Sequence, residues 1–436
     1  MMDGNEILSR LGKLREVNSS KDIQQLTAAM FPGTHCPLMG AAMAVRGIRD
    51  AVLLVVGTDE CAYYTKHMTL HSEEFGGLGG RCVSAVLDTR DVTFGCKAML
   101  DEAVKELVEE YSPRAVFVVS TCVVEVIGDD TDSMSEAYTK EYGIPFLPVH
   151  TEHFKCENHL PGLERTISAC FSLMKPCPEG TKPHGVNLLG QRAGIFEQTE
   201  LYQILHADGV EVVMELPCGC TVDEIVKAPQ AKANIVVNPI ALPLAEKMKE
   251  EFGTPYVLFD KFTDPERIQK TYQELFQALE LPYPQKLVEL YEGSKKKAQD
   301  ASHHLKGVTY IYGNTPFDCL EFNNFMVNLG MIPQIIQTVS VEPERDKGYL
   351  TDILSHSDPY VTKTANIAPL QYVYDVLHPN LYLGHEYAAR LRKKGIAMVH
   401  SDRASSMLGF EITDFITEEL VRAAQEAKGL TGEVQR

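Results

Sequence analysis

The chain has 436 residues, of which 44% are hydrophobic and 23% charged, so it is long enough for two or three globular domains and is not of disordered composition. Its formal net charge of −19 gives a phosphate backbone no general attraction, so we expect no nucleic-acid partner. No apolar run approaches the roughly 20 residues that span a bilayer, and the first residues lack the apolar core of a signal peptide. We therefore expect a cytoplasmic protein without a membrane partner.

One pattern repeats along the chain: a short apolar segment, a turn of small or polar residues, and a segment of helical periodicity. Continuous β-branched and aliphatic runs are typical of strands covered on both faces, as in parallel sheets. Between the strands lie amphipathic helices, for example over 96–112, where Leu100, Val104, Leu107 and Tyr111 recur at helical spacing. The predicted strands fall within 51–59, 114–122, 185–191, 233–239, 254–260, 308–314 and 380–386.

This alternation predicts an α/β protein with three doubly wound, Rossmann-like parallel-sheet domains and a helical N-terminal arm. A Pro- and Gly-rich stretch at 175–185 and a polar, basic helical stretch at 291–307 indicate the boundaries. We predict an arm over 1–30 and domains over 31–183, 184–300 and 301–436. In such folds, sites gather beyond the carboxyl ends of the strands.

Eleven cysteines, an odd number in a chain without a secretory signal, favour free thiols or metal ligands over a disulfide framework. Cys36, Cys61 and Cys122 follow small-residue turns in the first domain, where we expect them at one sheet edge. Each alone is more simply explained by core packing. Together they favour an iron–sulfur site, because converging thiolates are the ligands that such clusters need. Their spacing matches no short cluster motif.

Four segments, read in order, resemble the component 1 proteins of nitrogenase and their nitrogenase-like relatives: "HCPLMGAAMAVRGI", "GTDECAYY", "DVTFGCKAMLDEAV" and "STCVVEVIGDD". The resemblance is strongest over residues 31–160. It implies a nitrogenase component 1-like fold and an electron-relay cluster shared between two homologous subunits. Matched motif by motif, the ligands of this chain would be Cys36, Cys61 and Cys122. The implied cofactor is a P-cluster-type [8Fe–7S] or a [4Fe–4S] cluster, and the resemblance does not decide between them.

The resemblance also bears on subunit type. Catalytic α-type chains hold a second cofactor through a cysteine after a second-domain strand and through a late histidine. Here Asn238 occupies the first position, and Met407 or Leu408 lies near the second. His400 is a possible substitute, although a histidine at a strand end is more often structural. Other segments, such as "CTVDEIVKAPQA", resemble β-type subunits.

The implied function is therefore that of a β-type subunit in a nitrogenase-like, ATP-dependent reductase. Its partners would be an α-type sister subunit in an α2β2 heterotetramer and a transient iron protein. That iron protein would use the ATP, because this chain contains no GxxxxGK[ST] motif. The substrate site would lie mainly in the sister subunit. Alternatives are a metallocluster assembly scaffold subunit, a homo-oligomeric reductase, and a non-catalytic α/β binding protein with buried cysteines.

Histidines and a further cysteine recur every three residues after the predicted strand near 145–150. Such spacing drifts around a helix, so we interpret the segment as a loop and not a zinc site. The residues are His150, His153, Cys156 and His159.

Smaller features have simple explanations. We interpret Cys218 and Cys220 as part of a turn. Acids after Cys122 either shape the charge around it or favour a helix start through the helix dipole; they are Glu125, Asp129 and Asp130. We expect Tyr63 and Tyr64 to pack around Cys61 and exclude water.

Overall fold

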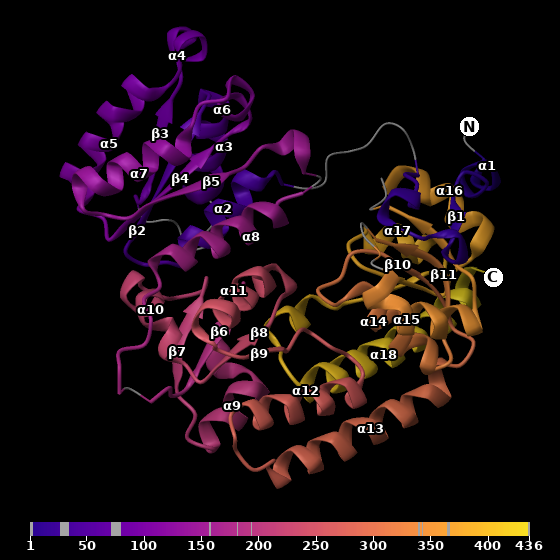
Figure 1. The fold of residues 1–436 in the computed structure, drawn as a ribbon. Helices are drawn as coiled ribbons and strands as arrows, with labels where there is room; N and C mark the ends of the chain where they lie inside the picture. The colour runs from indigo at the N-terminus through magenta and orange to yellow at the C-terminus, as the bar shows by residue number, and fades with distance from the viewer. Residues whose placement is uncertain are drawn as a thin grey trace.

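The computed structural model describes residues 3–26, 35–70, 80–156, 158–180, 182–192, 194–338, 341, 343–363 and 367–434. Within them the chain forms three separate open sheets, each flanked by helices (Figure 1). Fourteen described strands alternate with helices in chain order. This confirms the predicted α/β class with three doubly wound sheets.

The first sheet has the order β3-β2-β4-β5 and is parallel throughout. Its two central strands, β2 and β4, are buried at every position, which explains their continuous apolar runs. The order reverses between β2 and β4, and such a switch point opens a crevice at the carboxyl ends. The elements are α2 (Pro37–Arg46), β2 (Ala51–Gly57), α3 (Asp59–Leu70), β3 (Cys82–Val86), α4 (Thr89–Phe94), α5 (Lys97–Tyr111), β4 (Ala115–Ser120), α6 (Cys122–Ile127), α7 (Thr131–Tyr142), β5 (Phe146–His150), η3 (His153–Lys155), α8 (Leu160–Ala169) and η4 (Cys170–Leu173).

The second sheet repeats this plan with the order β7-β6-β8-β9, again parallel. Its switch point lies between β6 and β8. The elements are β6 (Val186–Leu189), η5 (Phe196–Gln198), α9 (Glu200–Ala207), β7 (Val212–Leu216), α10 (Val222–Lys227), η6 (Ala228–Gln230), β8 (Ala233–Val236), η7 (Pro239–Ala241), α11 (Leu242–Phe252), β9 (Tyr256–Leu258) and α12 (Pro265–Ala278).

The third sheet has the order β1-β12-β11-β10-β13-β14. The long helix α13 leads into it from the second unit, and α18 packs along α13 (Figure 1). Ser294 of α13 donates a hydrogen bond to Asp414 of α18 (2.6 Å). The elements are α13 (Gln285–Leu305), β10 (Thr309–Tyr312), α14 (Cys319–Asn328), β11 (Ile332–Gln337), α15 (Pro343–His356), β12 (Tyr360–Thr362), α16 (Ile367–Leu377), β13 (Leu381–Leu383), α17 (Ala388–Lys393), β14 (Ala397–Val399), η8 (Asp402–Ser406) and α18 (Phe410–Val434).

The N-terminal arm differs from the expected helical segment. It contains α1 (Gly4–Leu8), β1 (Gly12–Lys13), η1 (Leu14–Glu16) and η2 (Ser20–Asp22). Strand β1 pairs antiparallel with β12 at the edge of the third sheet, and Ile7, Leu8 and Leu11 pack in a core of that unit. A two-residue strand held by backbone pairing leaves no alternation in the sequence to reveal it.

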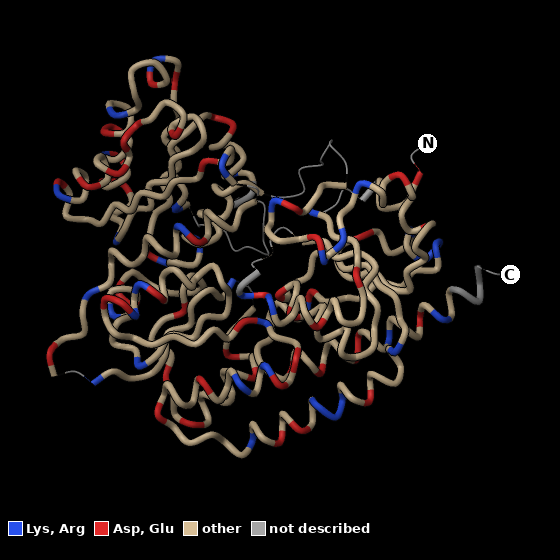
Figure 2. The backbone as a smooth tube through the Cα atoms, turned by 45° about the vertical axis from the view of Figure 1, so that its right-hand side comes forward, with Lys and Arg blue, Asp and Glu red and all other residues tan. Residues whose placement is uncertain are grey.

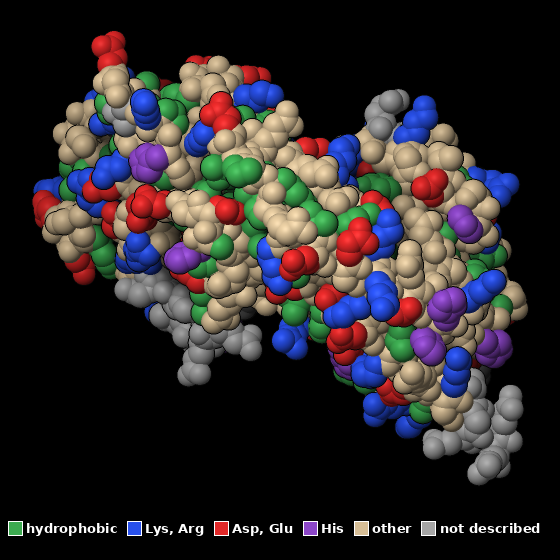
Figure 3. Space-filling model, turned by 90° about the horizontal axis from the view of Figure 1, so that it is seen from below, with side chains coloured by type: hydrophobic (Ala, Val, Ile, Leu, Met, Phe, Trp, Pro, Cys, Tyr) green, Lys and Arg blue, Asp and Glu red, His purple; other side chains and the backbone are tan. Residues whose placement is uncertain are grey.

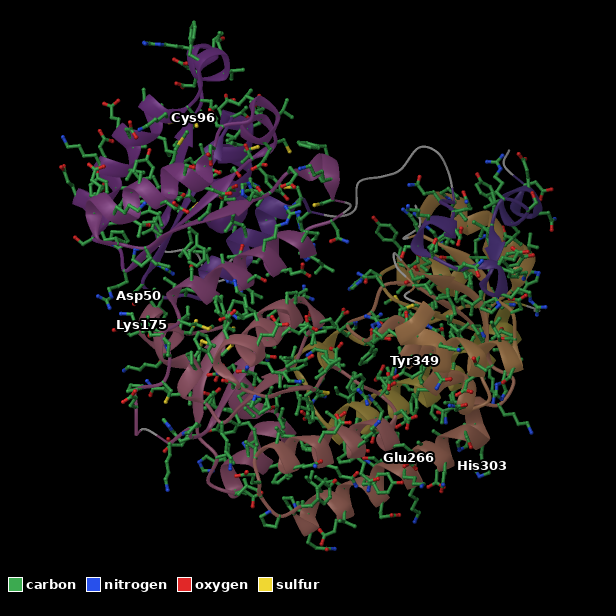
Figure 4. The ribbon with its side chains drawn as sticks, in the orientation of Figure 1. Asp50, Cys96, Lys175, Glu266, His303 and Tyr349 are labelled. Carbon is green, nitrogen blue, oxygen red and sulfur yellow. The ribbon has the colours of Figure 1, made fainter. Side chains whose placement is uncertain are left out.

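The first and second units meet at the turn before β2. Asp50 and Lys175 lie close to this junction in Figure 4. The Asp50 carboxylate accepts a hydrogen bond from the Val222 amide (2.8 Å), and the Lys175 amide donates to Val226 (3.1 Å). Backbone bonds of this kind give the two units a defined relative position.

Charged side chains of both signs are spread along the chain (Figure 2) and over the face seen from below (Figure 3). On that face no broad tract of one sign is visible. In the part of the chain that the structure describes, no helix is long and apolar enough to span a membrane.

Candidate metal centre

The three predicted cysteines lie at the carboxyl edge of the first sheet. Cys61 is in the first turn of α3, directly after β2, and Cys122 begins α6, directly after β4. Cys36 is the N-cap of α2. That helix leads into the start of β2, so its own start lies at the opposite, carboxyl edge. Cys36 thus caps a helix and does not end a described strand.

Close backbone packing holds these loops together. A Cβ atom on Gly57, the last residue of β2, would lie 2.1 Å from the Thr121 hydroxyl oxygen, so only glycine fits between the two loops. A Cβ on Gly162 of α8 would lie 1.8 Å from the Pro37 carbonyl oxygen, beside Cys36. The segments next to all three cysteines are therefore tightly packed.

The thiols form one electrostatic group. Burial is the main cause that raises the pKa of Cys36, opposed by the amides of Met39 and Leu38, and repulsion from Cys61 and Cys122 raises it further. All three cysteines are half-buried free thiols. Each also lies at or close to the start of a helix.

An aromatic and imidazole cluster lies beside Cys36. A hydrogen bond joins Nδ1 of His35 to the Tyr64 hydroxyl (2.5 Å), and the rings of His35 and His159 meet edge to face at 6.4 Å. Burial, followed by repulsion from Cys36, raises the pKa of Tyr64. The expectation for Tyr63 is wrong: its side chain is 70% exposed and stacks on His67.

An acidic network holds the start of α6 beside Cys122. His150 Nδ1 lies 2.7 Å from Glu125 Oε1 and His150 Nε2 lies 3.1 Å from Asp132 Oδ1. Burial lowers the pKa of His150, but the hydrogen bond and charge of Glu125, followed by Asp132, leave it raised. The Ser120 hydroxyl donates to Glu125, and the His153 amide donates to Sγ of Cys122 (3.2 Å). The network thereby orients the thiol.

The segment after β5 does not gather a single-ion site. His150 is engaged by acids, and Cys156 Sγ accepts a hydrogen bond from Arg165 (3.8 Å). Among the described residues, no three His, Cys, Asp or Glu side chains are placed to hold one metal ion. An iron–sulfur cluster needs a wider arrangement of ligands than a single ion, because each thiolate binds a separate iron atom. The donor set of Cys36, Cys61 and Cys122 is therefore suited to a cluster, with any fourth ligand supplied from elsewhere.

Exposed apolar side chains surround this edge. Phe94 is 82% exposed, Val126 72% and Phe154 58%. Tyr63, Val86 and Val92 are also exposed. A concentration of large apolar side chains on a soluble surface indicates a region that a partner covers.

A second group of charges lies where the three units meet, and sequence reasoning missed it. Arg192 follows β6, and Asp260 and the buried Lys261 follow β9. Burial, then repulsion from Arg192 and His35, lowers the pKa of His159 to about 4. Burial raises the pKa of Asp260 to about 6, with Asp318 of the third unit adding to the rise. The feature of the sequence that could have identified Arg192, Asp260 and Lys261 is their position just after the carboxyl ends of predicted strands.

The residues weighed as second-cofactor ligands have structural roles. Asn238 caps η7, with its side-chain oxygen accepting from the Ile240 amide (3.2 Å). Leu408 is fully buried in the core between the second and third units, Met407 follows η8 as its C-cap, and His400 is exposed. Cys218 and Cys220 flank Gly219 in a turn, as predicted.

Three doubly wound sheets, with three free cysteines near the switch-point edge of the first, define a multidomain α/β protein with a candidate thiol site. The chain belongs to the family of nitrogenase component 1 type oxidoreductases, which it matches over residues 36–425. That match begins at the first of the three cysteines. The family is thus the one that the sequence resemblance indicated.

Comparison with individual relatives narrows the assignment within this family only in part. The nitrogenase iron-molybdenum cofactor biosynthesis protein NifE of Clostridium pasteurianum is 34% identical over 223 residues, which are 51% of this chain and 49% of that protein. The nitrogenase molybdenum-iron protein alpha chain of Methanosarcina barkeri is 28% identical over 291 residues, 64% of this chain and 54% of that one. The chain thus spans about half the length of the curated relatives it matches.

The fold is that of a solved nitrogenase. The structure titled "Nitrogenase Cp1 at pH 6.5" superposes with a TM-score of 0.75 at 16% identity, over 92% of this chain and 94% of that one. These relatives support the family but not a β-type assignment specifically, because they are NifE proteins and an alpha chain.

Proposed function

We propose that this chain is a subunit of a heteromeric component 1-type complex in which Cys36, Cys61 and Cys122 hold part of an iron–sulfur cluster shared with a homologous subunit. The observation that carries the proposal is the grouping of the three thiols at one edge, surrounded by exposed apolar side chains. Three thiolates leave a four-iron cluster one ligand short. A second subunit that covers this edge of the sheet would supply the missing cluster ligand and would exclude water from the site.

The chain's own residues prepare this site. The His153 amide already donates a hydrogen bond to Sγ of Cys122. The Thr121 hydroxyl is buried without a hydrogen-bond partner among the described residues, so it is a donor for a group bound beside Cys122. A bound cluster would supply low-potential electron transfer, tuned by such hydrogen bonds and by exposure.

We further propose that the complex is a metallocluster assembly scaffold. The NifE relatives are named for cofactor biosynthesis. The group of charges where the three units meet includes Arg192 and Lys261, and position 238 is an asparagine in place of a thiolate. Cations without a covalent anchor suit an anionic cluster that is cargo, because such cargo has to be released.

A second candidate is the β-type subunit of an ATP-dependent reductase. It is favoured by Asn238 and by the lack of a late histidine ligand among the described residues. In that case an iron protein using ATP would deliver electrons to the thiolate-held cluster, and an α-type sister in an α2β2 assembly would carry the substrate site. A homo-oligomeric reductase is the variant of this candidate without a sister subunit.

Iron analysis tests the cluster. We expect the chain, purified without oxygen together with its homologous partner, to carry iron and sulfide. Cys61→Ser should remove most of both, whereas Cys177→Ser, in the linker between the first two units, should leave them unchanged. Iron at background in the unmodified complex, or equal iron in the two variants, would refute the cluster proposal.

Cluster transfer tests the scaffold. The loaded complex should pass metal to an acceptor nitrogenase component that lacks its cofactor. Lys261→Gln should reduce the transferable metal while leaving the iron that depends on Cys61. ATP-dependent substrate reduction with an iron protein, without any transfer, would instead favour the reductase and reject the scaffold.

A further inference from the structure

A groove of about 820 Å³ runs along strand β7 in the second unit, and we call it the β7 groove. It lies between β7 and α9, which contributes Tyr202 and His206. Its far end is formed by Arg49 and Gly219. This volume falls within the range of roughly 300–1,000 Å³ that ligand sites occupy. The residues that line the groove do not include the three cysteines or the group of charges where the three units meet.

Strand β7 is the edge strand of its sheet. Only β6 pairs with it among the described residues, so its other backbone edge has no strand partner there. Met214 and Leu216 are buried in the core, whereas the half-buried Val213 and Glu215 lie on the opposite side, because alternate residues share a face. Both line the groove. An unpaired edge of this kind is a template for another extended chain.

The lining is strongly acidic. Glu197, Glu211, Glu215 and Glu224 line it, with Arg49 as the single Lys or Arg, so four acids against one base leave a formal charge of −3. Arg49 and Glu224 are paired with each other (3.5 Å). Three carboxylates are therefore left without a cation in the groove.

Among these acids, Glu215 has a carboxylate without a partner in the described part of the chain and a raised pKa. The structure records no hydrogen bond or ion pair between its carboxylate and any described residue. Burial, followed by repulsion from Glu197 and Glu224, raises its pKa to about 7, against a weaker opposing effect of Arg49. A half-buried carboxylate that two others repel destabilises the protein unless a cation joins it.

We propose that the β7 groove binds an extended, lysine- or arginine-bearing segment of a partner polypeptide, which pairs with the free edge of β7 as an added strand. The excess of acid selects basic side chains, and the free backbone edge selects an extended chain over a compact cation. Five residues of β7 offer roughly 17 Å of edge. Because Val213 and Glu215 alternate with core residues, a segment of alternating apolar and basic residues fits best. This proposal does not depend on the cluster.

Binding to the full chain tests the proposal directly. A fluorescent, acetylated peptide of alternating lysine and valine should bind, as measured by anisotropy, and rising salt should weaken it. Glu215→Gln should weaken binding about tenfold or more, because a half-buried carboxylate opposite the peptide's ammonium is lost. Glu292→Gln, on the exposed face of α13, is the matched control and should bind like the unmodified chain.

Two further probes separate the occupants. The same peptide with N-methyl groups along the edge that would pair with β7 should not bind, and a peptide with glutamate in place of lysine should not bind. Equal binding of the N-methylated peptide, or of spermine in competition, would overturn the added strand. Absence of lysine-peptide binding above the glutamate control would overturn the site. If Glu215→Gln fails to fold, Glu197→Gln tests the same acidic lining from η5.

Discussion

The position of Cys36 depends on an arginine at the other end of its helix. Arg81 donates from Nη1 to the carbonyls of Ile48 (2.6 Å) and Ala51 (2.8 Å) and from Nη2 to that of Arg46 (3.4 Å). These carbonyls lie at the end of α2 and in the turn into β2, where a cation also complements the helix dipole. One half-buried side chain thus joins the helix that Cys36 caps to the strand that leads to Cys61.

Replacing this arginine should be costly. Arg81→Ala should lower the free energy of unfolding by about 2 kcal/mol, because three carbonyls lose a charged donor. Arg81→Lys should cost less, because an ammonium keeps the charge but cannot reach all three. Urea unfolding measures the difference, with the exposed Lys105→Ala as control within about 0.5 kcal/mol of the unmodified chain. Equal values for Arg81→Ala and this control would contradict the explanation.

At the scale of elements, the second and third units are joined by a reciprocal cap. The Glu200 carboxylate, at the start of α9, accepts from the amides of Phe410 (2.8 Å) and Glu411 (3.2 Å) at the start of α18. The Glu411 carboxylate accepts in return from the amides of Glu200 (3.0 Å) and Leu408 (2.9 Å). Each acid also complements the other helix's dipole. The cap therefore fixes the start of α9 against the start of α18.

Breaking the cap from one side should loosen both helices. Glu411→Ala leaves two amides without their acceptor and should cost on the order of 1–3 kcal/mol, whereas Glu411→Gln keeps an amide oxygen and should cost less. The hydrogen-exchange rates of the amides of Glu200 and Leu408 should increase together. Glu418→Ala, on an exposed position of α18, is the control. Unchanged exchange in Glu411→Ala would show that the cap does not hold these helices.

At the scale of the molecule, several buried acids share one direction of pKa shift. Burial is the main cause in each, and it raises the pKa of Glu200 and Glu215 to about 7, of Asp260 to about 6 and of Glu321 to about 8. A raised acid pKa means that the folded protein binds more protons than the unfolded chain between the two values. His159, with its pKa lowered to about 4, acts oppositely, but only below its usual value of about 6.5.

Stability should therefore fall as pH rises from about 6.5 to about 8. The stabilisation from the raised acids is fully present below their unfolded pKa, near 4.5, and is lost as pH rises through the folded values. Denaturant unfolding at the two ends of this window measures the loss. Glu321→Gln, which removes the group with the highest of these pKa values, should flatten the dependence. A stability that rises across the window would show that other groups dominate.

The sequence by itself determined the layered class and the family, because buried parallel strands require continuous apolar runs and strand-end turns leave local signatures. Tyr111, however, is 38% exposed although it continues the apolar face of α5. Strand β1, the position of Arg192 beside Asp260, and the acidic β7 groove came only from the tertiary structure. Each joins residues far apart in the chain, and no local periodicity records which distant charges or backbone edges will meet.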